Sequence, residues 1–281
     1  KFMKRKIYFL MLSLIVSVAS FAQQLSVQGV PRQQARTSVQ AEPAVVYPNV
    51  DFGQIEYWVG DGNNKAALVV KWDDGKGGNT NLVWGYMWDD EKDGTGAAML
   101  RAVAAADPRF YMLVYGNTQY GAAIGGFGYD LNENGNIALM KGGVSYSLTD
   151  GVYNTSTYDF DDWTSNDAND HWRSGWYNGY WSYWVTDDVN TAYEYSGLGA
   201  SSRTLSNGSI DGWSYMSDMT TWYSNDMSGE VEYVTEPAAI LAANAVKTNA
   251  YYADGNATAT TYTVRSATLE AFTEALDKAV D

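Results

Sequence analysis

The chain has 281 residues, of which 18 are basic and 33 acidic, so its formal net charge is −15 at pH 7. So acidic a chain repels nucleic acid phosphates and anionic lipid, which excludes both as expected partners and leaves cations and uncharged ligands. The sequence has no cysteine and one histidine, which excludes disulfides, thiolate sites and imidazole-rich zinc sites. Plain solubility is an equally simple explanation of the charge.

Residues 1–22 are predicted to be a secretory signal peptide. A basic KRK at 4–6 precedes an apolar run over 7–18, and SFA at 20–22 has the small residues of a cleavage site. The apolar run is too short to span a bilayer, so we expect no membrane insertion. The protein should be exported, to the cell surface, the extracellular space or the periplasm. Cleavage would remove four basic residues and no acid, which changes the net charge from −15 to −19.

Residues 23–50 hold three of the five prolines and show no sustained periodicity, so they are interpreted as a linker or N-terminal arm. Residues 51–235 are predicted to form a β-rich ligand-binding domain of the α+β class, with antiparallel strands and one short inserted helix. A helical C-terminal segment is expected over 236–281, where Pro237 lies in the first helical turn.

Short apolar and aromatic runs separated by Gly, Asp and Asn predict the strands of this domain. They cover 55–60, 65–72, 81–88, 109–116, 179–186, 191–196 and 209–216. The inserted helix should begin after the N-cap residue Thr95 and end at Asp107-Pro108. Between the third strand and this helix lies an acidic run, Asp89, Asp90, Glu91 and Asp93, which is either a metal or catalytic site or the polar rim of the connection.

The segment YDLNENGN suggests a calcium loop. Asp130, Asn132 and Asn134 alternate ahead of Gly135, and Asn136 can offer its carbonyl. Calcium takes about six to eight oxygen ligands, which such a loop can supply in part. The twelfth position is Lys141 instead of glutamate, which excludes an EF-hand. Two interpretations remain, a calcium loop completed by an acid from elsewhere (the run at 89–93 is one source) or an Asn/Gly hairpin turn.

Aromatic residues are unusually frequent, with 11 tryptophans and 22 tyrosines. The predicted ligand-binding surface comprises Trp172, Trp176, Tyr180, Trp181, Trp184 and Trp213. Trp181 and Trp184 are an odd number of residues apart, so in one strand they face opposite sides of the sheet. Unless the sheet is covered on both faces, one of them lies near the surface, where aromatic rings rimmed by Asn and Asp favour ligand binding. Burial in a core is the alternative.

Catalysis has weaker support. His171 would have to serve any Ser-His-Asp triad, and no nucleophile elbow accompanies it, so a structural or ligand-contacting role is favoured. A pair of Asp or Glu residues could hydrolyse glycosides, because acids are abundant near aromatics. Separation in sequence does not give separation in space, so a carbohydrate-active enzyme remains the alternative function.

Several segments together resemble a poorly characterised family of exported bacterial surface proteins. They are YWVGDG (57–62), LVWGYMWDD (82–90), GTGAAMLRAVAAADPRF (94–110), GGFGYDLNENGN (125–136) and GYWSYW (179–184), followed by 195–216. The resemblance implies ligand capture beside outer-membrane uptake systems, corrinoid (cobalamin) uptake among them. It also implies that the strand and helix around the acidic run pack as one unit, with the four acids as a polar rim.

The leading hypothesis is therefore a secreted, non-enzymatic binding protein. It would capture a small molecule, such as a corrinoid, or a glycan on its aromatic surface, with Ca2+ in the 130–136 loop and an outer-membrane transport system as partner. A structural or adhesive cell-surface protein is the third possibility, and it would have buried tryptophans and no deep pocket.

Overall fold

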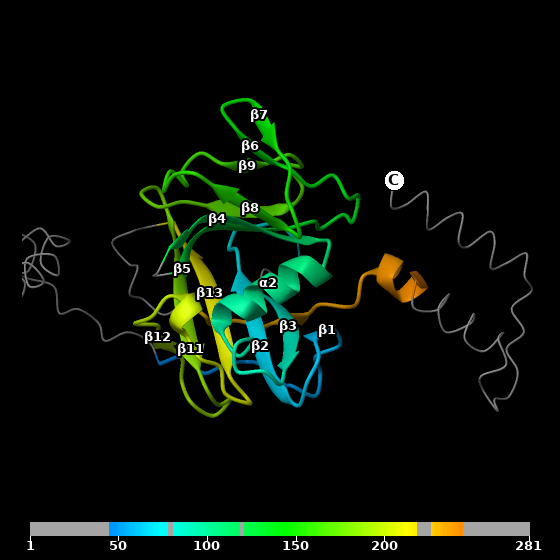
Figure 1. Cartoon of the computed structure of the whole chain (residues 1–281), viewed down its shortest axis with the longest axis vertical. Helices are drawn as coiled ribbons and strands as arrows, with labels where there is room; N and C mark the ends of the chain where they lie inside the picture. Colours follow the sequence, from blue (N-terminus) through cyan, green and yellow to red (C-terminus); the bar gives the residue numbers. More distant parts are fainter. Residues whose placement is uncertain (1–44, 78–80, 119–120, 218–225, 244–281) are drawn as a thin grey trace, which may run out of the picture. The chain divides into compact units, whose positions relative to one another are not determined.

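The computed structural model describes residues 45–77, 81–118, 121–217 and 226–243, and the expected signal peptide lies outside them (Figure 1). A seven-stranded sheet, here called the first sheet, has the order β1-β3-β2-β13-β11-β12, with β14 also paired to β3. Its strands are β1 (Trp58–Gly60), β2 (Asn64–Lys71), β3 (Asn81–Trp88), β11 (Tyr180–Thr186), β12 (Glu194–Tyr195), β13 (Ile210–Met216) and β14 (Glu232–Tyr233).

Two smaller sheets follow. The second sheet has the order β10-β5-β4-β8 and the third has the order β7-β6-β9. Their strands are β4 (Phe110–Thr118), β5 (Gly121–Tyr129), β6 (Leu139–Lys141), β7 (Val144–Tyr146), β8 (Val152–Thr155), β9 (Thr164–Ser165) and β10 (His171–Ser174). The helices are α2 (Gly96–Ala106) and the short 3-10 helix η1 (Ala200–Ser202), and residues 238–243 are also helical. The rest of the expected 236–281 helical segment lies outside the described residues.

The helix forms where the sequence predicts it. Thr95 has extended backbone angles, and its side-chain oxygen accepts a hydrogen bond from the backbone N–H of Ala98. The cap satisfies a donor that the first turn leaves free. Met99, Leu100 and Val103 then form the buried stripe of α2, and Asp107 ends the helix ahead of Pro108. None of the described helices has the length and apolar character that a membrane crossing requires.

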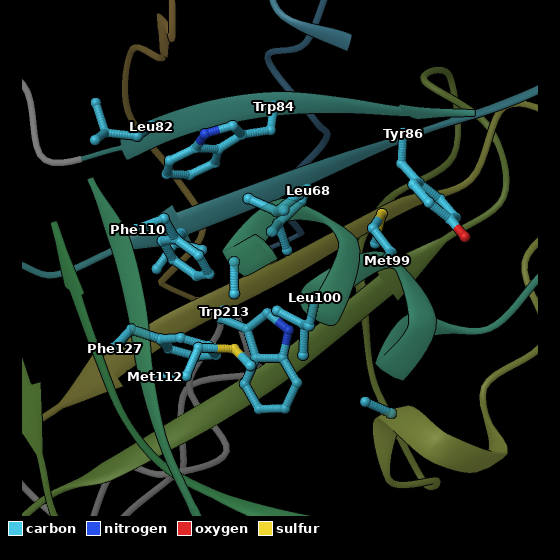
Figure 2. Packing of buried hydrophobic residues seen from close by; sticks show 14 of the residues in the cluster. Leu68, Leu82, Trp84, Tyr86, Met99, Leu100, Phe110, Met112, Phe127 and Trp213 are labelled. Atoms are coloured by element: carbon cyan, nitrogen blue, oxygen red, sulfur yellow. The ribbon is translucent and has the colours of Figure 1, made fainter. Parts of the chain in front are cut away.

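The first sheet is covered on both faces. Along β2, Leu68 and Val70 belong to a core shared with α2 and the second sheet, while Ala67 and Val69 face a separate core with Val50 and Met227. Figure 2 shows the shared core, where Trp213 lies with Leu100, Met112 and Phe127. Burial on both faces explains why these strands are continuous apolar runs without alternation.

The second sheet is covered on both faces in the same way. Phe110, Met112 and Val114 of β4 face the shared core, and Tyr111 and Leu113 face a third core. The third core also contains Leu139, Phe160, Trp163 and Trp172. The molecule therefore stacks layers around three apolar clusters.

The expectation of an antiparallel domain is only partly right, because the sheets are mixed. β2 pairs antiparallel with β3 but parallel with β13, and β4 pairs antiparallel with β5 but parallel with β8. The parallel β2–β13 pair joins Ala67 to Ile210. A pairing across so long a separation leaves no mark in local sequence patterns, whereas a hairpin does.

Candidate functional site

Most of the predicted aromatic surface is buried. Trp181, Trp184 and Trp213 are 2%, 3% and 5% exposed. Trp181 and Trp213 lie in the core shared with α2, and Trp184 lies on the opposite face of the first sheet. The sheet is covered on both faces, which is the condition under which neither Trp181 nor Trp184 needs to approach the surface. The structure does not bring the six predicted residues onto one surface.

Two of the other three predicted residues lie nearer the surface. Trp176 and Tyr180 are half-buried, and their rings meet edge to face with centroids 6.1 Å apart. Trp172 in β10 is buried, 8% exposed, and stacks on Tyr111 with ring centroids 5.6 Å apart and planes 5° apart. Trp176 packs against the third core, to which Trp172 belongs, but of these three residues only Trp172 borders a further feature of the surface.

That feature is a hollow of about 360 Å³ beside β9 and β10. Its aromatic lining consists of Trp163, Trp172 and Tyr215, and its polar lining includes Lys76, Asp162, Ser165, Asp167, Arg173 and Ser174. Of the predicted aromatic residues, Trp172 alone lines it. Trp163 and Tyr215 lie only nine residues before Trp172 and two residues after Trp213, but only the packing of strands shows that they border the same hollow.

Hydrogen bonds fix the aromatic wall of the hollow. Trp172 donates from Nε1 to the backbone oxygen of Trp163 over 2.7 Å, and Ser174 donates to the same oxygen over 3.2 Å. Trp163 donates from its own Nε1 to the backbone oxygen of Asp159 over 2.8 Å. Both indoles therefore keep their polar atoms satisfied while their rings stay in place.

Two basic side chains that line the hollow form no direct ion pair among the described residues, although the charge of Lys76 acts on the Asp74 carboxylate. Lys76 donates from Nζ to the backbone oxygen of Asp170, and Arg173 donates from Nη2 to the backbone oxygen of Asp73 over 3.2 Å. The guanidinium of Arg173 lies over the ring of Tyr215, 5.4 Å from its centroid, and its Nε is buried without a hydrogen-bond partner. In so acidic a chain, cations left without an ion pair are positioned for an anionic or hydroxyl-rich ligand.

The predicted calcium loop adjoins this hollow. Asp130 is buried at the end of β5, and its carboxylate accepts hydrogen bonds from the backbone N–H groups of Asn134 (3.3 Å) and Gly135 (2.8 Å). Gly135 has a φ of +68°, the left-handed conformation that favours glycine. The side-chain oxygen of Asn136 accepts a hydrogen bond from Asn166 Nδ2 over 2.6 Å. The backbone carbonyl of Asn136, which is the ligand predicted from the sequence, takes no part in this hydrogen bond.

Asp167 completes the loop from the other side. Its Oδ2 accepts hydrogen bonds from the side-chain amides of Asn132 (3.0 Å) and Asn134 (2.6 Å). A backbone hydrogen bond from Asn169 and these two amide hydrogen bonds lower the pKa of Asp167 to about 2, so the group is an anion at neutral pH. The acid that joins the loop is thus Asp167, and the sequence could not indicate it.

Asp170 lies next to this arrangement and is fully buried. Its Oδ2 accepts from the hydroxyls of Tyr111 (3.2 Å) and Ser165 (3.3 Å), while its Oδ1 is buried without a partner. Ser165 also accepts a hydrogen bond from the backbone N–H of Asp167, so it bridges the two acids. Burial and the nearby charges of Asp130 and Asp167 raise the pKa of Asp170 to about 6.

His171 is buried within the fold. Its Nδ1 donates to Asp74 over 2.9 Å, its ring stacks on Trp72 with centroids 4.9 Å apart, and both side chains of the pair are almost wholly buried. Burial, the largest single effect, raises the pKa of Asp74, but the hydrogen bond and charge of His171 together with the backbone N–H and charge of Lys76 lower it overall. The His171–Asp74 contact therefore holds the segment that contains Lys76 against β10.

The acidic run at the end of β3 is mostly exposed. Asp89 accepts a hydrogen bond from the backbone N–H of Asn63 over 2.8 Å, and Asp90 forms an exposed ion pair with Lys92. It forms a turn between β3 and α2. In the part of the chain that the structure describes, no three His, Cys, Asp or Glu side chains are gathered to hold a metal ion by themselves, so any metal site there also needs amide or carbonyl oxygens.

Comparison of the chain with models of protein families, with curated proteins and with solved structures finds no match.

Proposed function

We propose that this chain is an exported, non-enzymatic binding protein that holds a glycan or similar small polar molecule in the hollow beside β9 and β10. One observation carries the proposal. The same hollow of about 360 Å³ is bordered by two indole side chains and a phenol and by hydrogen-bonding groups of both charges. Sugar rings pack their C–H faces on aromatic rings, while their hydroxyls need such donors and acceptors.

The hollow favours the smaller of the ligand classes that the sequence suggests. Its volume is near the lower end of the range of about 300–1,000 Å³ that is typical of small-molecule sites. A whole corrinoid is much larger and would lie mainly outside it. The resemblance to exported surface proteins supports export and delivery of the ligand to an outer-membrane uptake system, which are parts of the same proposal.

Binding is favoured over hydrolysis by the acids of the hollow. Glycoside hydrolysis needs a pair of carboxyl groups, one of which is protonated to donate to the leaving oxygen. The two carboxyl groups that line the hollow are Asp162 and Asp167. Because four amide donors lower the pKa of Asp167 to about 2, this group does not carry the proton at neutral pH, and Asp162 would have to supply it. The Asp162 side chain is exposed, whereas the acid of such a pair usually lies in apolar surroundings.

A structural or adhesive surface protein is the second candidate function. The burial of Trp181, Trp184 and Trp213 favours it. The two candidate functions differ in whether the hollow binds a ligand, because only the binding protein requires it to do so.

A glycan array followed by isothermal titration of residues 23–281, in calcium-containing buffer, tests the proposal. Neutral and carboxylated oligosaccharides are compared, and cobalamin is titrated separately. We expect saturable binding of a carboxylated or hydroxyl-rich glycan that weakens by about tenfold or more in Lys76→Gln and in Arg173→Gln, because each loses charged hydrogen bonds.

Lys65→Gln and Arg101→Gln are the matched controls, because both side chains lie outside the hollow, and they should leave the affinity unchanged. Absence of binding to every glycan would overturn the proposal and favour the structural function. Binding of cobalamin alone, insensitive to Lys76 and Arg173, would overturn the assignment of the hollow.

A further inference from the structure

The loop at 130–136 and Asp167 gather oxygen-bearing side chains from two distant segments. The loop contributes Asp130, Asn132 and Asn134, and the connection between β9 and β10 contributes Asp167. The amides of Asn132 and Asn134 converge on one atom, Asp167 Oδ2, at 3.0 and 2.6 Å. These contacts bring two side chains that each carry an oxygen atom within hydrogen-bond distance of the Asp167 carboxylate.

The second observation is the buried, unpaired oxygen of Asp170. This carboxyl group is 0% exposed, and its Oδ1 has no hydrogen-bond partner. Ser165 links it to Asp167 through the hydrogen bonds described above. Neither Asp130, Asp167 nor Asp170 forms an ion pair within the described residues. Buried carboxyl groups are normally paired or bound to a metal, because an uncompensated buried charge is costly.

We propose that Asp130, Asn132, Asn134 and Asp167 bind one calcium ion, with the carbonyl of Asn136 as a further ligand and buried Asp170 as supporting negative charge. A half-turn of each Asn amide exchanges its nitrogen and oxygen and turns Oδ1 toward the centre beside Asp167. This exchange gives up the hydrogen bonds that Asn132 and Asn134 accept within the loop (3.1 and 2.7 Å) and those that their amides donate to Asp167. It replaces them with metal–oxygen bonds to a divalent ion.

Calcium fits this set of ligands better than magnesium or zinc. Calcium accepts carboxylate, amide and carbonyl oxygens in a flexible geometry, whereas magnesium demands a near-ideal octahedron and keeps several waters. Zinc prefers thiolate and imidazole. The proposal replaces the acidic run 89–93 with Asp167 as the source of the missing carboxylate.

Titration of chelator-stripped protein (residues 23–281) with CaCl2 tests the proposal without any other ligand, so its outcome is separate from that of the proposed glycan function. Heat of binding, the thermal midpoint and terbium luminescence are measured. Tyr111 lies within hydrogen-bond reach of Asp170, so its ring and that of Trp172 should sensitise bound terbium. We expect one saturable calcium site, a higher thermal midpoint with calcium, and displacement of terbium by calcium.

Variants identify the site. Asp167→Asn and Asn134→Ala should each weaken calcium binding by about tenfold or more, because each removes one ligand of a small set. Asn134 is exposed, so its replacement leaves the core intact. Asp90→Asn is the control, an exposed acid in the 89–93 turn. The proposal is overturned if stripped protein takes up no calcium, or if Asp167→Asn and Asn134→Ala bind it as tightly as the parent and the control do.

Discussion

The side-chain amide of Asn134 donates to Asp167 Oδ2 over 2.6 Å, and this contact joins segments 33 residues apart. Asp167 also lines the hollow, so one carboxylate belongs to the candidate cation loop and to the candidate binding surface. A conformational change in the loop should therefore affect the hollow through Asp167, which belongs to both. The two proposals make a joint prediction for this reason.

Removal of calcium should weaken the binding of the ligand in the hollow. Chelation frees Asp167 from the metal and the 165–170 connection from its anchor, so part of the binding energy is used to order that wall. We expect the Kd of the ligand to rise by about threefold to tenfold in EDTA, measured by isothermal titration. The Asp167→Asn variant should show no such dependence on EDTA. A Kd identical with and without calcium would show that the calcium loop and the hollow are energetically independent.

Arg109 forms one buried and one exposed ion pair, so it allows their contributions to the free energy of unfolding to be compared. It binds Asp107 through Nε over 2.9 Å and Glu133 through Nη1 over 2.8 Å, and Trp84 Nε1 also donates to Asp107 over 2.9 Å. Asp107 is fully buried, whereas the Glu133 side chain is 53% exposed. Asp107→Ala removes the acceptor of the buried Nε of Arg109 and of the Trp84 indole N–H, and it should cost about 3–5 kcal/mol of unfolding free energy.

Glu133→Gln should cost only about 0–1 kcal/mol, because a solvent-exposed ion pair is screened. Urea denaturation followed by tryptophan fluorescence measures both variants. Equal losses in the two variants would contradict the assignment of the buried pair as the one that stabilises this end of α2.

Gly128 allows two aromatic rings to meet across a strand. It lies between Tyr111 on β4 and Trp172 on β10, and a Cβ at this position would be 2.2 Å from the Tyr111 ring. Gly128→Ala should therefore destabilise the protein by about 1–3 kcal/mol, as overpacking of a tight core does. Gly197→Ala is the control, because no atom lies within 4 Å of its Cβ position, and it should stay within about 0.5 kcal/mol. Equal unfolding midpoints in the two variants would show that the Tyr111 ring can move aside.

Local patterns predicted the elements well and their assembly poorly. Thr95 as N-cap and the strands 65–72 and 81–88 follow from capping and apolar runs, which act over a few residues. The glycine-rich strand β5 was not predicted as a strand, because its glycines permit the close approach of Tyr111 and Phe160 and so dilute the apolar pattern. For the site, the alternation of Asp130, Asn132 and Asn134 was visible, but the contact with Asp167 depends on how β9 and β10 pack.

Asp211 should make stability depend on pH between about 4 and 6. Burial, partly opposed by the hydrogen bond from Tyr183 and the charge of Arg203, raises the pKa of Asp211 from 3.8 to about 6. The folded state then holds this proton more tightly than the unfolded state does. The stabilisation is fully present below the unfolded pKa near 4 and is lost as the pH rises through about 6. A shift of this size corresponds to roughly 3 kcal/mol.

Thermal unfolding from pH 4.5 to 7.5, in calcium-free buffer, measures this contribution. Asp211→Asn keeps the shape of the side chain and removes the titration, so its curve should be flatter than that of the parent over the same range. The absolute stability of Asp211→Asn also reflects the lost contact with Arg203 (3.3 Å), so the comparison is of slopes and not of midpoints. Parallel curves for parent and variant would mean that Asp211 titrates near its ordinary pKa in the folded protein.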